Sequence, residues 1–361
     1  MSKGIGIPKE QLSEDGDPCI LYGELYTKYK SEIIKQVESK TDIDGSKLKR
    51  SKANDVIIPC SGETAVDIAT ARCVPFDSIL LGGDLNVISL HKYDGAFMSY
   101  QLNGKRKYDI ARVAQGVSVV HLYGEHLKTI KTYNPTLPEQ QKIAILLSLL
   151  DERIATQNKI IEDLKKLKCA IIEKLYSKIQ GKEYSYGQLF DVVNERNKQM
   201  EYYNILSASQ EKGMVNRDDL NLDIQFERSN INTYKIVRKG DYVIHLRSFQ
   251  GGFAFSDKLG VCSPAYTILR PNSLLEYSYL SYYFTSQRFI KSLIIVTYGI
   301  RDGRSINVEE WLNMKVVIPS KEHQLHTLNV LKRIDDKVEN EEKYATCLSN
   351  QKQYLLRQMF I

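Results

Sequence analysis

The sequence predicts an α+β protein in which two related globular blocks alternate with two long helices. A helical segment from Pro135 to Ser177 repeats without a gap from Pro319 to Ile361, at an offset of 184 residues, the difference between 319 and 135. The intervening blocks contain short apolar runs separated by Gly, Asn, Asp and Pro, which is typical of strands. The two blocks also resemble each other. We place the blocks at residues 1–135 and 181–320, and the helices at 136–180 and 321–361.

Apolar residues in both helices recur at alternating steps of three and four residues, which is the a/d pattern of a coiled coil. We predict that the helices pair through Leu147, Leu150, Ile154, Ile161, Leu164 and Ile171 in the first, and through Leu331, Ile334, Val338, Leu348 and Leu355 in the second. Polar residues interrupt both patterns at equivalent places: Gln157 and Lys168 in the first helix, Glu341 and Lys352 in the second. Helices with matched interruptions look like partners in one coiled coil.

The interrupting lysines allow two interpretations. They can fix the register of the helix pair at some cost in stability, or they can extend their ammonium groups to solvent near a helix end. The sequence leaves both open. Each helix of roughly 40 residues is about 60 Å long. Pro138 suits a first helical turn, and Gly181 is expected to act as a stop after the first helix.

The two blocks share short sequence patterns. In the first block, Asn54–Ile58 resembles Gly240–Ile244 of the second, and Phe97–Tyr100 resembles Tyr279–Tyr282. The second block also opens on a strand-like stretch, Tyr186–Val193, for which the first block shows no counterpart before Ile20. We therefore expect the first block to lack its opening strand.

Composition predicts a cytoplasmic protein with no membrane partner. The chain has 361 residues and a formal net charge of +6, which permits contact with a polyanion without demanding it. Its six cysteines are scattered without a Cys-x-x-Cys pair, as expected for reduced thiols. The N-terminus carries no apolar signal segment, and no apolar run reaches about 18 residues.

The sequence shows none of the motifs of common nucleotide-dependent enzymes. It contains no phosphate-binding loop and no Gly-x-Gly-x-x-Gly after a strand. The Asn134–Leu137 stretch does not match the Asn/Asp-Pro-Pro-aromatic motif of amino-methyltransferases, and no Pro-Asp pair suits a Mg-dependent nuclease. His323 and His326 could hold a metal by spacing, but we expect them to be solvated. We therefore predict no catalytic site and no metal site.

Four short clusters are candidates for contact with DNA, because base edges need donors and acceptors whereas phosphates need cations. In the second block, two glycine-bounded clusters contain Arg247, Ser248 and Gln250, and Arg301, Arg304 and Ser305. In the first block, basic runs contain Lys49 and Arg50, and Lys105, Arg106 and Lys107. A solvated surface is the alternative for the basic runs.

The helices carry the words that identify a family resemblance. Leu137–Ala144, Leu149–Ile154, Leu164–Lys168 and Glu173–Tyr176 resemble the central conserved region of the specificity (S) subunits of type I restriction–modification enzymes. The second helix is a degenerate copy. Arg238–Asp241, leading to Cys262–Tyr266, is similar to a target recognition domain. The resemblance covers nearly the whole chain.

This resemblance implies that the blocks are target recognition domains, each contacting one half of a bipartite site in double-stranded DNA. Homologous readers should contact half-sites separated on the order of one helical turn. The helices would form an antiparallel coiled coil that docks two methyltransferase subunits, and through them the nuclease/translocase subunits. S-adenosylmethionine, ATP and Mg are expected on those partner subunits, with no cofactor on this chain. The alternative is an incomplete or silent specificity cassette, or an assembly decoy, that binds methyltransferase without full DNA recognition.

Overall fold

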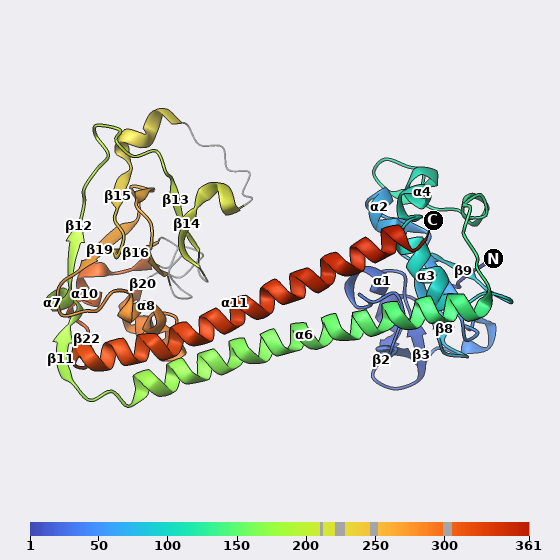
Figure 1. Cartoon of the computed structure of the whole chain (residues 1–361), viewed down its shortest axis with the longest axis horizontal. Helices are drawn as coiled ribbons and strands as arrows, with labels where there is room; N and C mark the ends of the chain where they lie inside the picture. The colour runs from blue at the N-terminus through green and yellow to red at the C-terminus, as the bar shows by residue number, and fades with distance from the viewer. Residues whose placement is uncertain (210–211, 221–227, 246–251, 299–304, 361) are drawn as a thin grey trace. The chain divides into compact units, whose positions relative to one another are not determined.

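The computed structural model describes residues 1–209, 212–220, 228–245, 252–298 and 305–360 (Figure 1). The chain divides into two compact units. Unit 1 comprises Met1–Ile160 with Glu341–Ile361, and unit 2 comprises Ile161–Asn340. Each unit contains one globular block together with part of each long helix, and both blocks mix helices with sheets. The predicted α+β fold class is confirmed.

The long helices are α6 (Leu137–Ser177) and α11 (Lys321–Gln358). A capping box starts α6, because the Glu139 carboxylate accepts from the Thr136 hydroxyl at 2.7 Å and from the Thr136 backbone N–H at 3.0 Å. Within the described residues, no helix is both long and apolar enough to span a bilayer.

The expected role of Gly181 as a helix stop is wrong. The helix α6 ends at Ser177, and Gly181 lies beside strand β22 (Lys315–Ile318). A Cβ atom at position 181 would stand 2.2 Å from the Ile318 carbonyl oxygen. Glycine is required there because two backbone segments approach closely.

The two helices pair antiparallel, as unit 1 shows most directly. There Asp151 contacts Lys352, and Gln157 contacts Glu341, so residue numbers rise along α6 while they fall along α11. In unit 2, Lys168 contacts Asp335, which continues the same order. Residues 157 and 341 are equivalent under the 184-residue offset, so the two interrupting polar residues meet each other (Figure 1).

The residues predicted to pair the helices differ in burial. Leu147 and Leu331 are fully buried, and Ile161, Val338 and Leu348 are at most 9% exposed. The remaining predicted residues are half-buried: Leu150, Ile154, Leu164, Ile171, Ile334 and Leu355. By contrast, Leu149 is 57% exposed, as expected for a position outside the three–four pattern.

Unit 1 contains two four-stranded sheets, in the orders β1-β9-β5-β7 and β2-β4-β3-β8, and a short β6–β10 pair. The strands are β1 (Ser2–Lys3), β2 (Leu12–Ser13), β3 (Asp17–Ile20), β4 (Ser39–Thr41), β5 (Asp55–Pro59), β6 (Ser61–Gly62), β7 (Arg72–Val74), β8 (Leu80–Leu81), β9 (Leu85–Ile88) and β10 (Val120–His121). The short helices are α1 (Glu24–Thr27), α2 (Ala65–Ile68), α3 (Gly95–Asn103), α4 (Lys107–Val113) and α5 (Gly124–Leu127).

Unit 2 contains a four-stranded sheet in the order β12-β19-β16-β17, and the pairs β11–β22, β13–β14, β15–β18 and β20–β21. Its strands besides β22 are β11 (Lys182–Ser185), β12 (Phe190–Val193), β13 (Leu206–Ser209), β14 (Gly213–Asn216), β15 (Lys235–Val237), β16 (Tyr242–Ile244), β17 (Phe253–Phe255), β18 (Gly260–Cys262), β19 (Thr267–Pro271), β20 (Thr297–Tyr298) and β21 (Ser305–Ile306). The short helices are α7 (Tyr186–Leu189), α8 (Tyr279–Tyr283), α9 (Gln287–Ser292) and α10 (Val308–Asn313).

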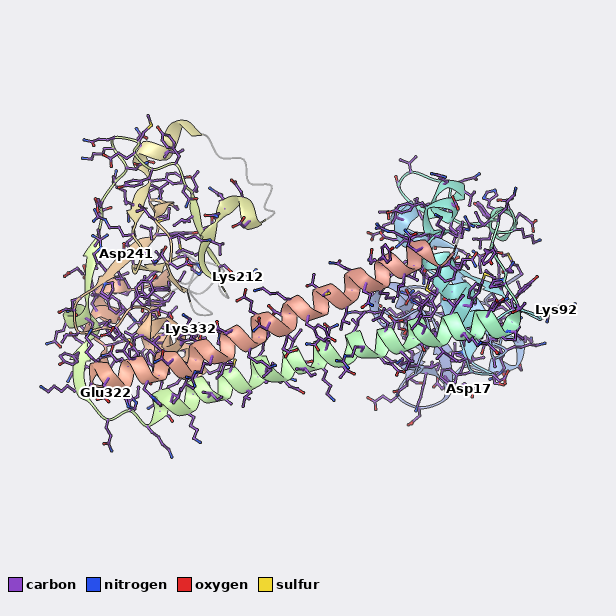
Figure 2. All side chains as sticks on the ribbon, in the orientation of Figure 1. Asp17, Lys92, Lys212, Asp241, Glu322 and Lys332 are labelled. Atoms are coloured by element: carbon purple, nitrogen blue, oxygen red, sulfur yellow. The ribbon has the colours of Figure 1, made fainter. Side chains whose placement is uncertain are left out.

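The turns that start β5 and β16 confirm the predicted similarity of the two blocks. Asn54 and Gly240 both adopt a positive φ, of 80° and 99°. The aspartates that follow, Asp55 and Asp241, are buried, and each accepts the backbone N–H three residues earlier, at 2.9 and 2.8 Å. Asp241, labelled in Figure 2, also binds the Arg270 guanidinium. The pattern found in the sequence therefore encodes the same turn twice.

The opening strand that the first block was expected to lack is present as β1. In unit 1, β1 occupies the edge of the β1-β9-β5-β7 sheet that β12 occupies in β12-β19-β16-β17. With only two residues, β1 is too short to show an alternating pattern, which explains why the sequence did not reveal it. The strand prediction is wrong, and the observation behind the silent-cassette alternative loses this support. No described residue of unit 1 takes the place of β11 and α7.

Candidate nucleic-acid interface and its attachment to the helices

Each globular block is attached to the start of one long helix by a buried glutamine. Gln140 accepts the Asp94 backbone N–H at 2.9 Å and donates to the Pro135 carbonyl at 2.8 Å. Its equivalent, Gln324, accepts the Glu276 backbone N–H at 2.7 Å and donates to the carbonyls of Leu274 and Pro319. Both side chains are 1% exposed. The glutamine in the repeated helix motif is therefore a structural link between block and helix.

A second link in each unit joins a tyrosine, an aspartate and a lysine. In unit 1, the Tyr100 hydroxyl donates to Asp151 at 2.7 Å, and Lys352 lies 2.6 Å from the same carboxylate. In unit 2, the Tyr282 hydroxyl donates to Asp335 at 2.7 Å, and Lys168 pairs with Asp335. Each ammonium also lies over the tyrosine ring, at 5.7 Å in unit 1 and 5.2 Å in unit 2. Both lysines are paired across the helices, which favours the register interpretation over extension into solvent.

The unit 1 cluster is more buried and contains an additional acid. Glu32 lies 2.6 Å from Lys352, and the side chains of Glu32, Asp151 and Lys352 are 9%, 9% and 16% exposed. Burial raises the pKa of Glu32, and the neighbouring Lys352 opposes this rise. In unit 2, Lys168 and Asp335 are 28% and 37% exposed. The two equivalent links therefore differ in how strongly they depend on their lysine.

A polar cleft in unit 1 follows the surface from the helix ends to the recognition block. Its first part has a volume of about 650 Å³ and is lined by basic side chains from four segments, with hydroxyls and amides between them. These basic residues are Lys30, Arg72, Lys107, Lys352 and Arg357. The acids Glu32 and Asp151 also line it but pair with Lys352. Such a lining suits a sugar–phosphate backbone.

The second part of the cleft shares Lys30, Thr70 and Arg72 with the first and has a volume of about 800 Å³. Ser61, Glu63 and Ser118 line it, together with the start of α2. The two segments meet because Ser61 and Gly62 pair with His121 and Val120. Carboxylates and hydroxyls can accept from base edges, so this part suits sequence readout.

The segments of this second part correspond to the two candidate clusters of the second block. Strand β6 follows β5, as residues 245–252 follow β16, and the turn before β10 precedes α5, as residues 299–304 precede α10. Arg247, Ser248, Gln250, Arg301 and Arg304, and the side chain of Ser305, lie outside the described residues. Their predicted role stays a prediction.

The candidates of the first block have different positions. Lys107 lines the cleft, Lys105 is exposed, and Arg106 is half-buried, with its guanidinium 3.6 Å from Asp109. Arg50 binds Asp17 at 2.6 Å and the Ser78 carbonyl at 3.0 Å, so its guanidinium joins two loops of its own block. Lys49 is half-buried, and neither Lys49 nor Arg50 lines the cleft.

Sequence reasoning missed Lys30, Glu63 and Arg357. None lies in a basic run of the recognition blocks, and they meet only because α1, α2 and α11 lie around one cleft. The place of Glu63, just after the strand equivalent to the one before Arg247, is a signal that could have identified it. His323 and His326 are exposed, and the described part of the chain holds no group of three or more potential metal ligands.

Comparisons with known proteins agree on one family. Residues 9–166 match the family described as the type I restriction modification DNA specificity domain. The type I restriction enzyme MjaVIII specificity subunit of Methanocaldococcus jannaschii is 25% identical over 324 residues, which cover 80% of this chain and 74% of that protein.

Two solved structures share the fold. A type I restriction–modification S subunit from M. genitalium has a TM-score of 0.54 at 17% identity, covering 100% of this chain and 93% of its own. A chain from a study of complex assembly and conformational transition of the type I R-M system has a TM-score of 0.57 at 12% identity, covering 99% and 94%.

Proposed function

We propose that this chain, which belongs to the specificity subunits of type I restriction–modification enzymes, recognises a bipartite DNA site, with one half-site for each block. The observation that carries the proposal is the repeated attachment: the same glutamine link and the same tyrosine–aspartate–lysine link join each block to the helix pair. A fixed attachment with divergent loops allows the recognised sequence to change while the scaffold stays constant.

In this proposal the chain supplies recognition and no catalysis. The helix pair docks two methyltransferase subunits, and the nuclease/translocase subunits join through them. S-adenosylmethionine, ATP and Mg are assigned to those partners. Methylome sequencing with and without the gene is expected to show that methylation at one split motif depends on this chain. Unchanged methylation at every motif would contradict the proposal.

The basic part of the unit 1 cleft is expected to bind phosphates. Replacing Lys107 and Arg357 with alanine should weaken binding to all DNA sequences. It should also flatten the slope of log K against log salt by about 1.8, since each phosphate contact contributes about 0.9. The measurement is a salt titration of DNA binding by the chain reconstituted with its methyltransferase.

The matched control is Lys92→Ala, which removes a cation that lines neither part of the cleft (Figure 2). A double variant with the same salt slope as this control would show that the cleft does not contact phosphates.

Glu63 is expected to contact a base edge. Its carboxylate can accept from the amino group of cytosine, whereas a glutamine amide prefers adenine. Glu63→Gln should change the preference at one position of one half-site by about 1–3 kcal/mol. Binding to a library randomised in that half-site measures this, with Glu10→Gln as the control because Glu10 is exposed and outside the cleft. Identical preferences in both variants would exclude Glu63 from readout.

A further inference from the structure

Unit 1 contains an apolar groove at the outer edge of its β1-β9-β5-β7 sheet. The groove has a volume of about 220 Å³. Ile88 and Leu90 at the end of β9, Leu102 of α3, and Leu127 and Ile130 around α5 line it, and Thr132 and Asn134 form its rim. An apolar groove of this kind is unusual on a domain whose other surfaces are polar, and it asks for an occupant.

Unit 2 shows what fills the equivalent space. The 184-residue offset extends back from the helices, so that Leu127 corresponds to Trp311, Ile130 to Met314, and residues 131–134 to β22. In both units a backbone N–H donates across this turn, from Ile130 to the Leu127 carbonyl and from Met314 to the Trp311 carbonyl. The two places are therefore structurally equivalent.

In unit 2 the space is occupied by the chain's own segment Lys182–Val193. Tyr186 stacks on Trp311 with ring centroids 4.2 Å apart, and Phe190 contacts Phe284 at 6.3 Å. Tyr186, Leu189 and Phe190 are 1%, 0% and 3% exposed. The same segment pairs with β22 through β11, and the Tyr186 backbone N–H donates to the Met314 carbonyl at 3.0 Å. Three apolar anchors and one strand pairing hold it.

In unit 1 the strand that would receive such a segment is in place without a partner strand. Gln101, fully buried, donates to the Tyr133 carbonyl at 2.7 Å and accepts the Tyr133 backbone N–H at 2.7 Å. This side chain fixes residues 131–134, the counterpart of β22, although no strand is assigned to them. The described residues thus provide the groove and the strand edge, but not the segment.

We propose that this groove is a docking site for a strand–turn segment of another polypeptide, with apolar anchors spaced as Tyr186, Leu189 and Phe190 are. The segment adds a strand to the edge at residues 131–134 and places its anchors against Leu102, Leu127 and Ile130, which is recognition by strand addition. A second copy of this chain is disfavoured as donor, because its own Lys182–Val193 segment is buried in its unit 2.

The sheet registers fix how the segment must enter. Val56 pairs with Ile88 as Tyr242 pairs with Leu269, and Val192 pairs with Leu269. Ser2 pairs with Val87, which is next to Ile88, so Met1 stands at the place of Val192. The docked segment therefore ends where β1 begins, with its last anchor two residues before the position of Met1.

The test uses the full chain and a fluorescent synthetic peptide with the sequence Lys182–Val193. Fluorescence anisotropy is expected to show saturable binding, whereas a control peptide with Tyr186→Ser, Leu189→Ser and Phe190→Ser should bind at least tenfold more weakly. In the chain, Leu90→Arg should abolish binding. Val117→Arg should leave it unchanged, because Val117 is 96% exposed and outside the groove. Equal binding of both peptides would overturn the proposal.

A fusion provides a measurement that does not depend on Leu90→Arg folding. Residues 182–191 placed directly before Met1 should raise the thermal unfolding midpoint of the chain, and the fusion with three serines should not. No difference between the two fusions would overturn the proposal. So would a concentration-dependent dimer of the chain that excludes the peptide, since the occupant would then be a second copy. DNA binding is not part of either readout, so the result is independent of the proposed function.

Discussion

Replacing Lys352 with methionine is expected to destabilise unit 1 by about 3–5 kcal/mol, the cost typical of removing one partner from a buried ion pair. The variant leaves the carboxylates of Glu32 and Asp151 in a buried site without their shared cation. Methionine retains most of the side-chain volume, so the loss is electrostatic more than steric. Urea unfolding followed by far-UV circular dichroism measures the change.

The defect of this variant is expected to depend on pH. Burial raises the pKa of Glu32, and removing Lys352 takes away the charge that opposes the rise. A carboxyl whose pKa is higher in the folded state gives its full stability contribution at low pH, and that contribution is lost as pH rises through the folded-state pKa. The stability difference between wild type and variant should therefore be larger at pH 8 than at pH 5. A difference independent of pH would show that Glu32 is not the cause.

The matched control is Lys168→Met, the same change at the position 184 residues earlier. Its partner Asp335 is 37% exposed, so water can solvate the carboxylate that remains. We expect a loss of at most about 1 kcal/mol, as for exposed pairs. The single tryptophan, Trp311, is buried in unit 2, so its fluorescence locates the effect of each variant. Equal losses in the two variants would contradict the distinction drawn between the links.

Leu147→Ala is expected to cost about 2–5 kcal/mol, because it leaves a cavity in a fully packed site. Leu147 is completely buried among Phe97 and Tyr100 of the recognition block and Leu356 and Phe360 near the end of α11. This cluster joins the block to both helices, so its loss should also loosen the recognition block. Chemical unfolding measures the first effect, and limited proteolysis of residues 1–135 measures the second.

Leu149→Ala is the control for this variant, because it removes the same atoms two residues away, where the side chain is 57% exposed. Its effect is expected to stay within about 0.5 kcal/mol. Leu331→Ala, the equivalent of Leu147→Ala in unit 2, should be as costly as Leu147→Ala, since Leu331 is also fully buried. A costly Leu149→Ala would mean that the helix faces were assigned incorrectly.

The helices were the most predictable part of the protein because their information is local. A three–four spacing of apolar residues determines which face is buried, whatever the rest of the chain does. The repeat then identified Gln140 with Gln324 and Lys168 with Lys352, although not what any of them contacts. The role of Gly181 was misjudged because the residue it approaches, Ile318, is 137 positions away in the sequence, the difference between 318 and 181.

The candidate site was less predictable, since its residues come from segments that have no common pattern. Basic runs identified Lys107, but they also selected Arg50, which binds Asp17 and Ser78 of its own block. Lys30, Glu63 and Arg357 are unremarkable in the sequence. They form one cleft only because distant segments fold against each other.

By itself, the sequence determined two related α+β blocks, two helices with matched polar interruptions and a family resemblance that the comparisons bear out. These features follow from periodicity and repetition, which are readable along the chain. Only the tertiary structure decided that Lys352 meets two acids whereas Lys168 meets one aspartate, and that β1 fills the place of β12. It alone also showed that the groove beside residues 131–134 is open. Those features depend on burial and on contacts between residues far apart in the chain, which no local pattern encodes.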